Sequence, residues 1–172
     1  MRAKPTPSPA NKMHSQADLS VCGLYRYLLQ RQWGDGAICA FVGLNPSTAT
    51  ADSDDATVRC TAFAKNWGFS GITMANLCAV RCRRPQILST HQDPIGPEND
   101  RFLLPTVKQA HTLVAMWGNH GLKSYGLSAR RDQDILALRD DWQCIGITMH
   151  GAPRHPLYAA KTSALIPFAN TP

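Results

Sequence analysis

Four short apolar runs recur along this chain, at 37–43, 71–77, 111–117 and 142–148. Near-continuous apolar runs of this length are typical of strands that are buried on both faces of a parallel sheet. Segments with helical spacing lie between them, and strands that alternate with helices imply right-handed crossovers. The pattern therefore predicts an α/β protein, a three-layer α/β/α sandwich with a central four-stranded parallel sheet.

Helices are predicted over 56–67, 97–110, 129–139 and 157–166. The first helix would be capped by Asp54 or Asp55 and ended by Gly68. Its inner face is expected to consist of Val58, Ala62, Phe63 and Trp67. Pro105 should kink or shorten the second helix, because proline lacks the N–H that a helix interior needs.

Residues 1–18 are rich in Pro, Ser, Lys and Asn and show no hydrophobic period, so a disordered tail is predicted there. Residues 19–172 then form a single α/β domain, because no change in composition marks a further boundary. Within this domain, 22–33 is interpreted as a strand at the edge of the sheet, followed by a turn at Gly34–Gly36.

The composition is that of a globular protein, since 44% of the 172 residues are hydrophobic and 17% are charged. No apolar run approaches the roughly 20 residues of a membrane span, and the first residues lack the apolar core of a signal peptide. We therefore expect a cytoplasmic protein without a membrane partner, whose six cysteines are reduced thiols. No CxxC pair occurs, so neither a metal site nor a cofactor is predicted.

The net charge of +6 favours a polyanion as partner but does not demand one. A cluster of arginines follows the second apolar run, at Arg81, Arg83 and Arg84, and Arg154 stands near the C-terminus.

Each predicted strand delivers polar residues where it ends. Asn45 follows the first strand, Asn76 ends the second, Asn119 follows the third, and the segment 148–158 follows the fourth. Ligands bind beyond the carboxyl ends of strands in open α/β sheets, so we expect these residues to converge on one site. The glycine-rich motifs that hold nucleotide phosphates are absent, and no Ser-His-Asp triad is evident.

Four segments, in order along 37–160, resemble motifs of the uracil-DNA glycosylase superfamily. They are 43–47 (Gly-Leu-Asn-Pro-Ser), 74–81 (Met-Ala-Asn-Leu-Cys-Ala-Val-Arg), 114–118 (Val-Ala-Met-Trp-Gly) and 155–158 (His-Pro-Leu-Tyr). The first is similar to the Gly-Ile-Asn-Pro-Gly motif of the mismatch-specific branch. The resemblance implies a uracil-DNA glycosylase-like fold and hydrolysis of the N-glycosidic bond of a flipped, unusual or modified base.

The chain also resembles, more specifically and over most of 21–168, a bacterial and phage family of unknown function, DUF1643. This similarity includes the segments 25–27, 43–49, 93–100 (Asp-Pro-Ile-Gly-Pro-Glu-Asn-Asp) and 151–158. That family supplies no activity, so the expectations about function follow from the glycosylase resemblance.

The glycosylase resemblance implies a role for several residues. Asn45 would hold the attacking water, Asn76 would pair with the amide-like edge of the base, and His155 would donate a hydrogen bond to the leaving base. Leu157 would fill the gap left in the base stack. Further candidate residues are Leu44, Ser47 and Thr48 beside the base, and Arg81, Arg83, Arg84 and Arg154 on DNA phosphates.

The chain departs from the resemblance in three places. Asn45 stands where the most active branch carries Asp, so it cannot act as a general base and slow catalysis is expected. The stretch 50–55 lacks a stacking aromatic and carries three carboxylates, of which Asp52 is the candidate catalytic group. The last motif is two residues short, and an alignment without a gap puts Pro153 in the place of the histidine and removes His155 from that role.

Two alternatives stay open. A non-catalytic module on the same fold would bind a nucleobase or nucleic acid without cleaving it. An enzyme acting on a free nucleoside would use Asp52, Asp54 and Asp55 for a metal or acid site. The sequence does not indicate an oligomeric state.

Overall fold

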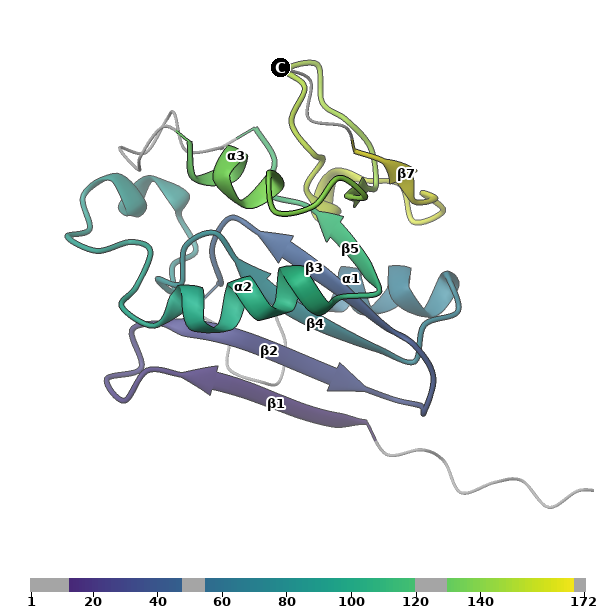
Figure 1. The fold of residues 1–172 in the computed structure, drawn as a ribbon, viewed down its shortest axis with the longest axis horizontal. Helices are drawn as coiled ribbons and strands as arrows, with labels where there is room; N and C mark the ends of the chain where they lie inside the picture. Colours follow the sequence, from purple (N-terminus) through teal and green to yellow (C-terminus); the bar gives the residue numbers. More distant parts are fainter. Residues whose placement is uncertain (1–12, 48–54, 120–129, 169–172) are drawn as a thin grey trace, which may run out of the picture.

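The computed structural model describes residues 13–47, 55–119 and 130–168. Its strands are β1 (His14–Leu19), β2 (Arg26–Gln32), β3 (Ile38–Gly43), β4 (Gly71–Asn76), β5 (Thr112–Ala115), β6 (Gln143–Cys144) and β7 (Ile166–Pro167). Its α-helices are α1 (Asp55–Asn66), α2 (Asn99–Gln109) and α3 (Arg131–Leu136), and 3₁₀ turns form η1 (Pro85–Ser89) and η3 (Pro156–Tyr158). The seven strands make one sheet in the order β1-β2-β4-β3-β5-β6-β7 (Figure 1).

The sheet is mixed. The four predicted apolar runs form the neighbours β4-β3-β5-β6, and each adjacent pair among them is parallel. β1 and β2 extend the sheet antiparallel beside β4, and β7 pairs antiparallel with β6. The α/β class is therefore confirmed, but the predicted sheet of four parallel strands is too small, because antiparallel strands are added on both sides.

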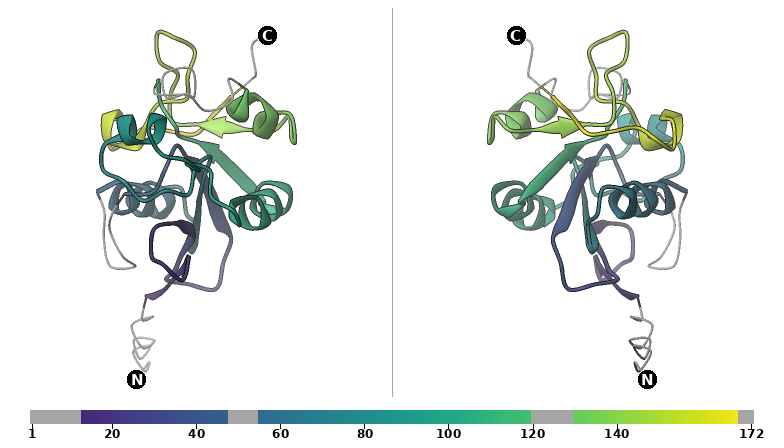
Figure 2. Two further views of the ribbon diagram at one scale, coloured as in Figure 1. Left: turned by 90° about the vertical axis from the view of Figure 1, so that its left-hand side faces the viewer. Right: turned by 90° about the vertical axis from the view of Figure 1, so that its right-hand side faces the viewer.

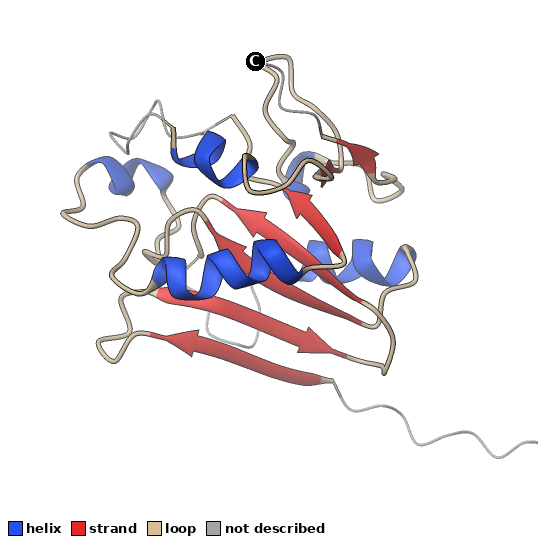
Figure 3. Ribbon diagram, in the orientation of Figure 1, coloured by secondary structure: helices blue, strands red, loops and turns tan. Residues whose placement is uncertain are grey.

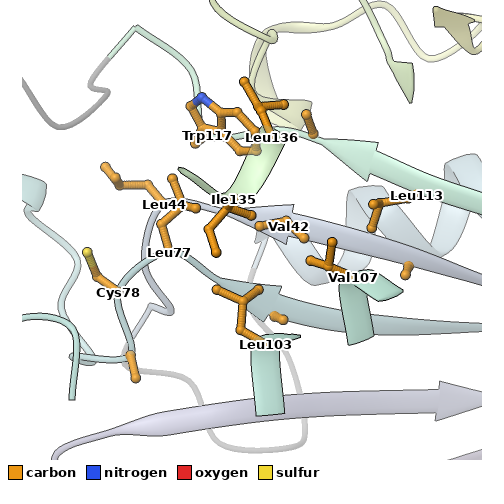
Figure 4. Packing of buried hydrophobic residues seen from close by; sticks show 14 of the residues in the cluster. Val42, Leu44, Leu77, Cys78, Leu103, Val107, Leu113, Trp117, Ile135 and Leu136 are labelled. Atoms are coloured by element: carbon orange, nitrogen blue, oxygen red, sulfur yellow. The ribbon is translucent and has the colours of Figure 1, made fainter. Parts of the chain in front are cut away.

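The central strand β3 is buried on both faces because a helix covers each of them. Cys39 and Phe41 face one cluster, which includes Cys60 and Ala64 of α1. Ala40 and Val42 face the other cluster, which α2 closes with Leu103 and Val107. Figures 2 and 3 show the sheet between α1 and α2, and Figure 4 shows Val42 packed beside Leu103, Val107 and Leu113. This burial explains why the sequence of β3 is an unbroken apolar run.

The predicted disordered tail is wrong for residues 14–18, which form most of β1. This strand pairs with β2 in a register that sets Ala17 opposite Leu29 and His14 opposite Gln32. β1 lies at the margin of the sheet and is mostly exposed, so it carries no hydrophobic alternation for sequence analysis to detect. Residues 1–12 lie outside the described part of the chain.

The structure confirms some of the predicted helices and contradicts others. α1 begins and ends within one residue of its prediction, but Val58 and Ala62 are exposed, and the buried positions include Thr57, Cys60, Phe63 and Ala64. Pro105 lies inside α2, which continues to Gln109. The helix predicted over 157–166 does not form, since Pro156–Tyr158 is a short 3₁₀ turn and the chain then pairs with β6 through β7.

Phe63 and Val58 test which face of α1 is buried. Phe63→Ala removes a ring that is 2% exposed and stacks on Trp67, so we expect a loss of about 3–5 kcal/mol in the free energy of unfolding. Val58→Ala, at a position that is 50% exposed, should stay within about 0.5 kcal/mol of wild type. Urea unfolding followed by circular dichroism measures both, and a larger loss for Val58→Ala would contradict the burial described here.

Candidate functional site

The exits of β3 and β4 lie side by side at the carboxyl edge of the parallel strands (Figure 1). Their pairing continues into the loops, because Leu77 N donates to Gly43 O at 2.9 Å and Cys78 N donates to Leu44 O at 2.9 Å. Further along, Cys82 N donates to Pro46 O at 3.0 Å. The two loops that carry Asn45 and Asn76 are therefore held against each other, as expected from the carboxyl-edge argument.

Asn45 ties these two loops together. Its side-chain Nδ2 donates to Pro46 O and to Cys82 O, at 2.9 Å each, and lies 3.2 Å from Cys82 Sγ. Both amide hydrogens thus point at the loops, which leaves Oδ1 as the atom that the half-buried side chain offers to a water molecule or ligand.

Asn76 ends β4 directly opposite Gly43 of β3. The residue is 4% exposed, and its Oδ1 lies 2.8 Å from the point where a Cβ on Gly43 would stand. Any side chain at position 43 would therefore displace the amide. No hydrogen bond joins the side-chain amide of Asn76 to another described residue, and this amide is not one of the fully buried polar groups that lack a partner.

His155 reaches the same edge from the loop after β6. Its ring Nδ1 accepts a hydrogen bond from Leu157 N at 3.3 Å, which caps η3. In the neutral ring the proton is then assigned to Nε2, which makes that nitrogen a donor. Gly118 N, at the exit of β5, donates to Pro153 O at 2.9 Å, and Arg59 of α1 donates to Pro156 O and Ala159 O. These bonds fix the loop on both sides of His155.

The four arginines that were predicted to contact phosphate differ in their exposure. Arg81 is half-buried and donates from Nη1 to Gly23 O at 2.8 Å, so it holds the turn between β1 and β2. Arg83 and Arg84 are exposed where η1 begins. Arg154 is exposed as well, and its Nη2 donates to Ile147 O at 3.3 Å. Three of the four arginines are thus exposed.

The remaining predicted residues fall into three groups. Leu44 is 6% exposed and points into the hydrophobic core beside Leu77, so it does not line an open surface (Figure 4). Ser47 is half-buried, and Leu157 is 44% exposed in η3. Thr48, Asp52 and Asp54 lie outside the described residues.

Sequence reasoning missed several residues near this edge. Met149 is 92% exposed at the tip of a hairpin in which Ile147 pairs with Pro153, and Tyr158 of η3 is 74% exposed. Asn99 and Arg131 lie behind the site, and both bond to the backbone of Leu77. Asn99 and Tyr158 had a signal in the sequence, because they belong to the segments 93–100 and 151–158 that carry the family resemblance.

No cluster of three or more potential metal ligands occurs within 13–47, 55–119 and 130–168, and no helix there is long and apolar enough to cross a membrane. An open hollow of about 490 Å³ lies between α2 and the sheet, where β3 and β5 begin, and is lined by residues such as Leu28, Ile38, Thr73, Phe102 and His111. It shares no residue with the edge that holds Asn45 and Asn76, so we assign the chemistry to that edge.

The fold and this edge define an α/β domain with two side-chain amides and one histidine gathered where its parallel strands end. The chain belongs to the family described as protein of unknown function (DUF1643), which matches residues 26–157 and so confirms the second resemblance given by the sequence. The comparisons with curated proteins and with solved structures find no match. The resemblance to uracil-DNA glycosylases stays a prediction.

Thiol reactivity tests the surroundings of the cysteines. Cys22 is exposed and the Ser20 hydroxyl lowers its pKa, whereas the other five cysteines are buried, and burial raises the pKa of Cys39 and of Cys78 to about 12. Because the thiolate is the reactive form, we expect an aromatic disulfide reagent at pH 8 to modify one thiol per native chain and six after unfolding. Cys22→Ser should abolish the native reaction, and its persistence would contradict this assignment.

Proposed function

We propose that the chain is a uracil-DNA glycosylase-like hydrolase that cleaves the N-glycosidic bond of a flipped base in DNA, on a three-layer α/β/α fold around the parallel strands β4-β3-β5-β6. The observation that carries the proposal is the side chain of Asn76, nearly buried at the end of a central strand and without a hydrogen bond within the described residues. An amide presents a donor and an acceptor in one plane. A pyrimidine edge with a carbonyl next to an N–H is its natural complement.

The reaction needs a positioned water and a stabilised leaving group. Asn45 supports the first requirement, because its Nδ2 is held by Pro46 and Cys82 and its Oδ1 is available to accept from water. His155 supports the second, because a ring that accepts at Nδ1 donates at Nε2 to the oxygen on which the departing base carries negative charge. Neither residue is an anionic base, so slow turnover is expected.

The loop after β6 favours His155 over Pro153 in this role. Pro153 is buried, pairs with Ile147 and accepts from Gly118 N through its carbonyl, and it has no side-chain donor. His155 is half-buried and carries an N–H. The alignment with a gap is therefore the chemically useful one.

Exposed charge and exposed apolar side chains support DNA as the partner. Arg83, Arg84 and Arg154 present positive charge, which suits phosphate contacts. Leu157 stands 44% exposed two residues after His155, where an apolar side chain can replace an extruded base in the stack.

A second candidate function is a non-catalytic reader of DNA bases. The observation in its favour is that Asn45 uses its amide hydrogens to hold loop carbonyls and supplies no base to activate water. Tight binding that falls steeply with salt, without release of any base, is the behaviour expected of such a module.

Base release tests the proposal directly. Labelled duplexes with uracil, hypoxanthine, mismatches or phage-type modified bases are incubated with the protein and treated with alkali, which cleaves abasic sites. We expect release from at least one substrate, a loss of about 10²–10³-fold in His155→Ala, and a similar loss in Asn76→Ala, because each removes a bond to the departing base. Asn45→Ala should abolish release.

Asn66→Ala serves as the control, because Asn66 is exposed at the far end of α1, and its activity should equal that of wild type. If wild type releases no base from any duplex, the glycosylase assignment is wrong, and a salt titration of DNA affinity then tests the reader.

The Leu157→Ala variant distinguishes the extrusion of the base from the cleavage of its glycosidic bond. In Leu157→Ala we expect duplex substrates to be cleaved about tenfold more slowly, while the same base in a single strand is cleaved at the wild-type rate, because unstacking a base from a duplex costs a few kcal/mol and a single strand avoids that cost. Single-turnover rates on the two substrates provide the measurement. Equal losses on both would exclude a role for Leu157 in the duplex.

A further inference from the structure

The segment 93–100 has no part in the proposed chemistry, yet it lies along the loop that follows Asn76. Ala79 N donates to Ile95 O at 2.9 Å, and Val80 N donates to Pro94 O at 3.3 Å. The segment closes on itself, because Asp93 Oδ1 accepts from Gly96 N at 2.9 Å. It therefore pairs through its backbone with the loop that follows Asn76.

Gly96 allows this close approach. Its φ is +93°, a backbone conformation that residues with a Cβ rarely adopt. A Cβ at this position would lie 2.8 Å from the Tyr25 ring and 3.2 Å from Ala79. The Tyr25 hydroxyl in turn donates to Asp93 O at 3.0 Å, which anchors the start of the segment to the beginning of β2.

Asn99 extends the contact to the site itself. This residue is fully buried, and its Nδ2 donates to Asn76 O at 3.0 Å and to Leu77 O at 3.2 Å. Its Oδ1 is buried and has no hydrogen-bond partner within the described residues. If the amide were turned over, Oδ1 would face the two carbonyl oxygens and repel them. The observed orientation therefore leaves Oδ1 without a partner but lets Nδ2 bond to both carbonyls.

Arg131 of α3 bonds to the second of these carbonyls, which belongs to the peptide group between Leu77 and Cys78. Its Nε donates to Leu77 O at 3.2 Å, while its other nitrogens pair with both carboxylate oxygens of Asp100. The Arg131 side chain is 11% exposed and that of Asp100 is 51% exposed, so the ion pair has its arginine inside the protein and its carboxylate at the surface. Leu77 O thus accepts from two side chains, one of them charged.

We propose that Asn99, Arg131 and Asp100 form a brace that sets the direction of the Asn76 side chain. The brace holds the two peptide groups on either side of Leu77, because Asn99 bonds to the carbonyls of Asn76 and Leu77 and Arg131 bonds to that of Leu77. The orientation of these two peptides affects where the Cα–Cβ bond of Asn76 points. These three are positioning residues and do not touch the base. The inference rests on the proposed function only where it makes Asn76 the base-reading group.

Hydrogen exchange tests the brace without any substrate. Arg131→Lys keeps a positive charge beside Asp100 but removes the donor to Leu77 O. We expect the backbone amides of Leu77, Cys78 and Ala79 to exchange at least about tenfold faster, because one charge-assisted hydrogen bond is lost. The amide of Met116, bonded to Val42 O in the core, should exchange at the wild-type rate.

Two further variants complete this experiment. Arg101→Lys changes an exposed arginine on α2 that pairs with Glu98, and it should leave exchange unchanged. Asp100→Asn, at a half-exposed position, weakens the ion pair and should give a smaller local increase in exchange, so the test does not depend on the folding of Arg131→Lys. Unchanged protection at 77–79, or an equal loss at Met116, overturns the brace.

A double-mutant cycle connects the brace with Asn76. On a duplex that wild type cleaves, Arg131→Lys should slow base release and reduce discrimination between that base and thymine. In an Asn76→Ala background the same substitution should have no further effect, because the side chain that it positions is absent. Additive losses would contradict the coupling.

The base-release assay and the exchange experiment test the proposed function and the brace independently. If no duplex is cleaved by wild type, the glycosylase assignment fails, and the exchange experiment still decides whether the brace exists. If bases are released but local exchange does not respond to Arg131→Lys or Asp100→Asn, the brace is wrong and the proposed function stands.

Discussion

The candidate site depends on backbone pairing that continues past the ends of β3 and β4. Hydrogen bonds from Leu77 to Gly43 and from Cys82 to Pro46 turn two exit loops into one layer. Loops normally remain at the surface because their peptide groups need water as partners. Here each loop supplies the partners of the other, so Asn76 can be nearly buried without orphaning the backbone around it.

Arginine side chains are used repeatedly to hold loop carbonyls. Among the described residues, guanidinium groups that donate to backbone carbonyls include those of Arg59, Arg81, Arg131, Arg139 and Arg154. A guanidinium has five donors in a rigid plane, so one side chain fixes several acceptors and stays charged. The net charge of +6 therefore reflects loop geometry as well as attraction to a polyanion, and it is weaker evidence for DNA binding than the count of basic residues suggests.

Sequence analysis succeeded where burial is uniform and failed where it is not. The runs that became β3, β4 and β5 were found because a strand that is buried on both faces has to be apolar along its length. The bounds of α1 were found within one residue, but half of its predicted inner face is exposed. β1 is mostly exposed, and its place in the sheet comes from pairing with β2 alone. The segment 157–166 has helix-forming residues, but its C-terminal part leads into β7, which pairs with β6.

The sequence by itself determined the α/β class, the membership of its family and the amides that follow β3 and β4, because apolar patterning and short motifs are local properties of the chain. Only the tertiary structure decided that Asn45 holds loops through Nδ2, that Leu44 is core, and that Asn99 and Arg131 both bond to the carbonyl of Leu77, the residue after Asn76. These contacts join residues between 22 and 54 positions apart. A pattern along the chain contains no information on the direction of a side chain across such a separation, since that direction is set by the packing of the elements that carry it.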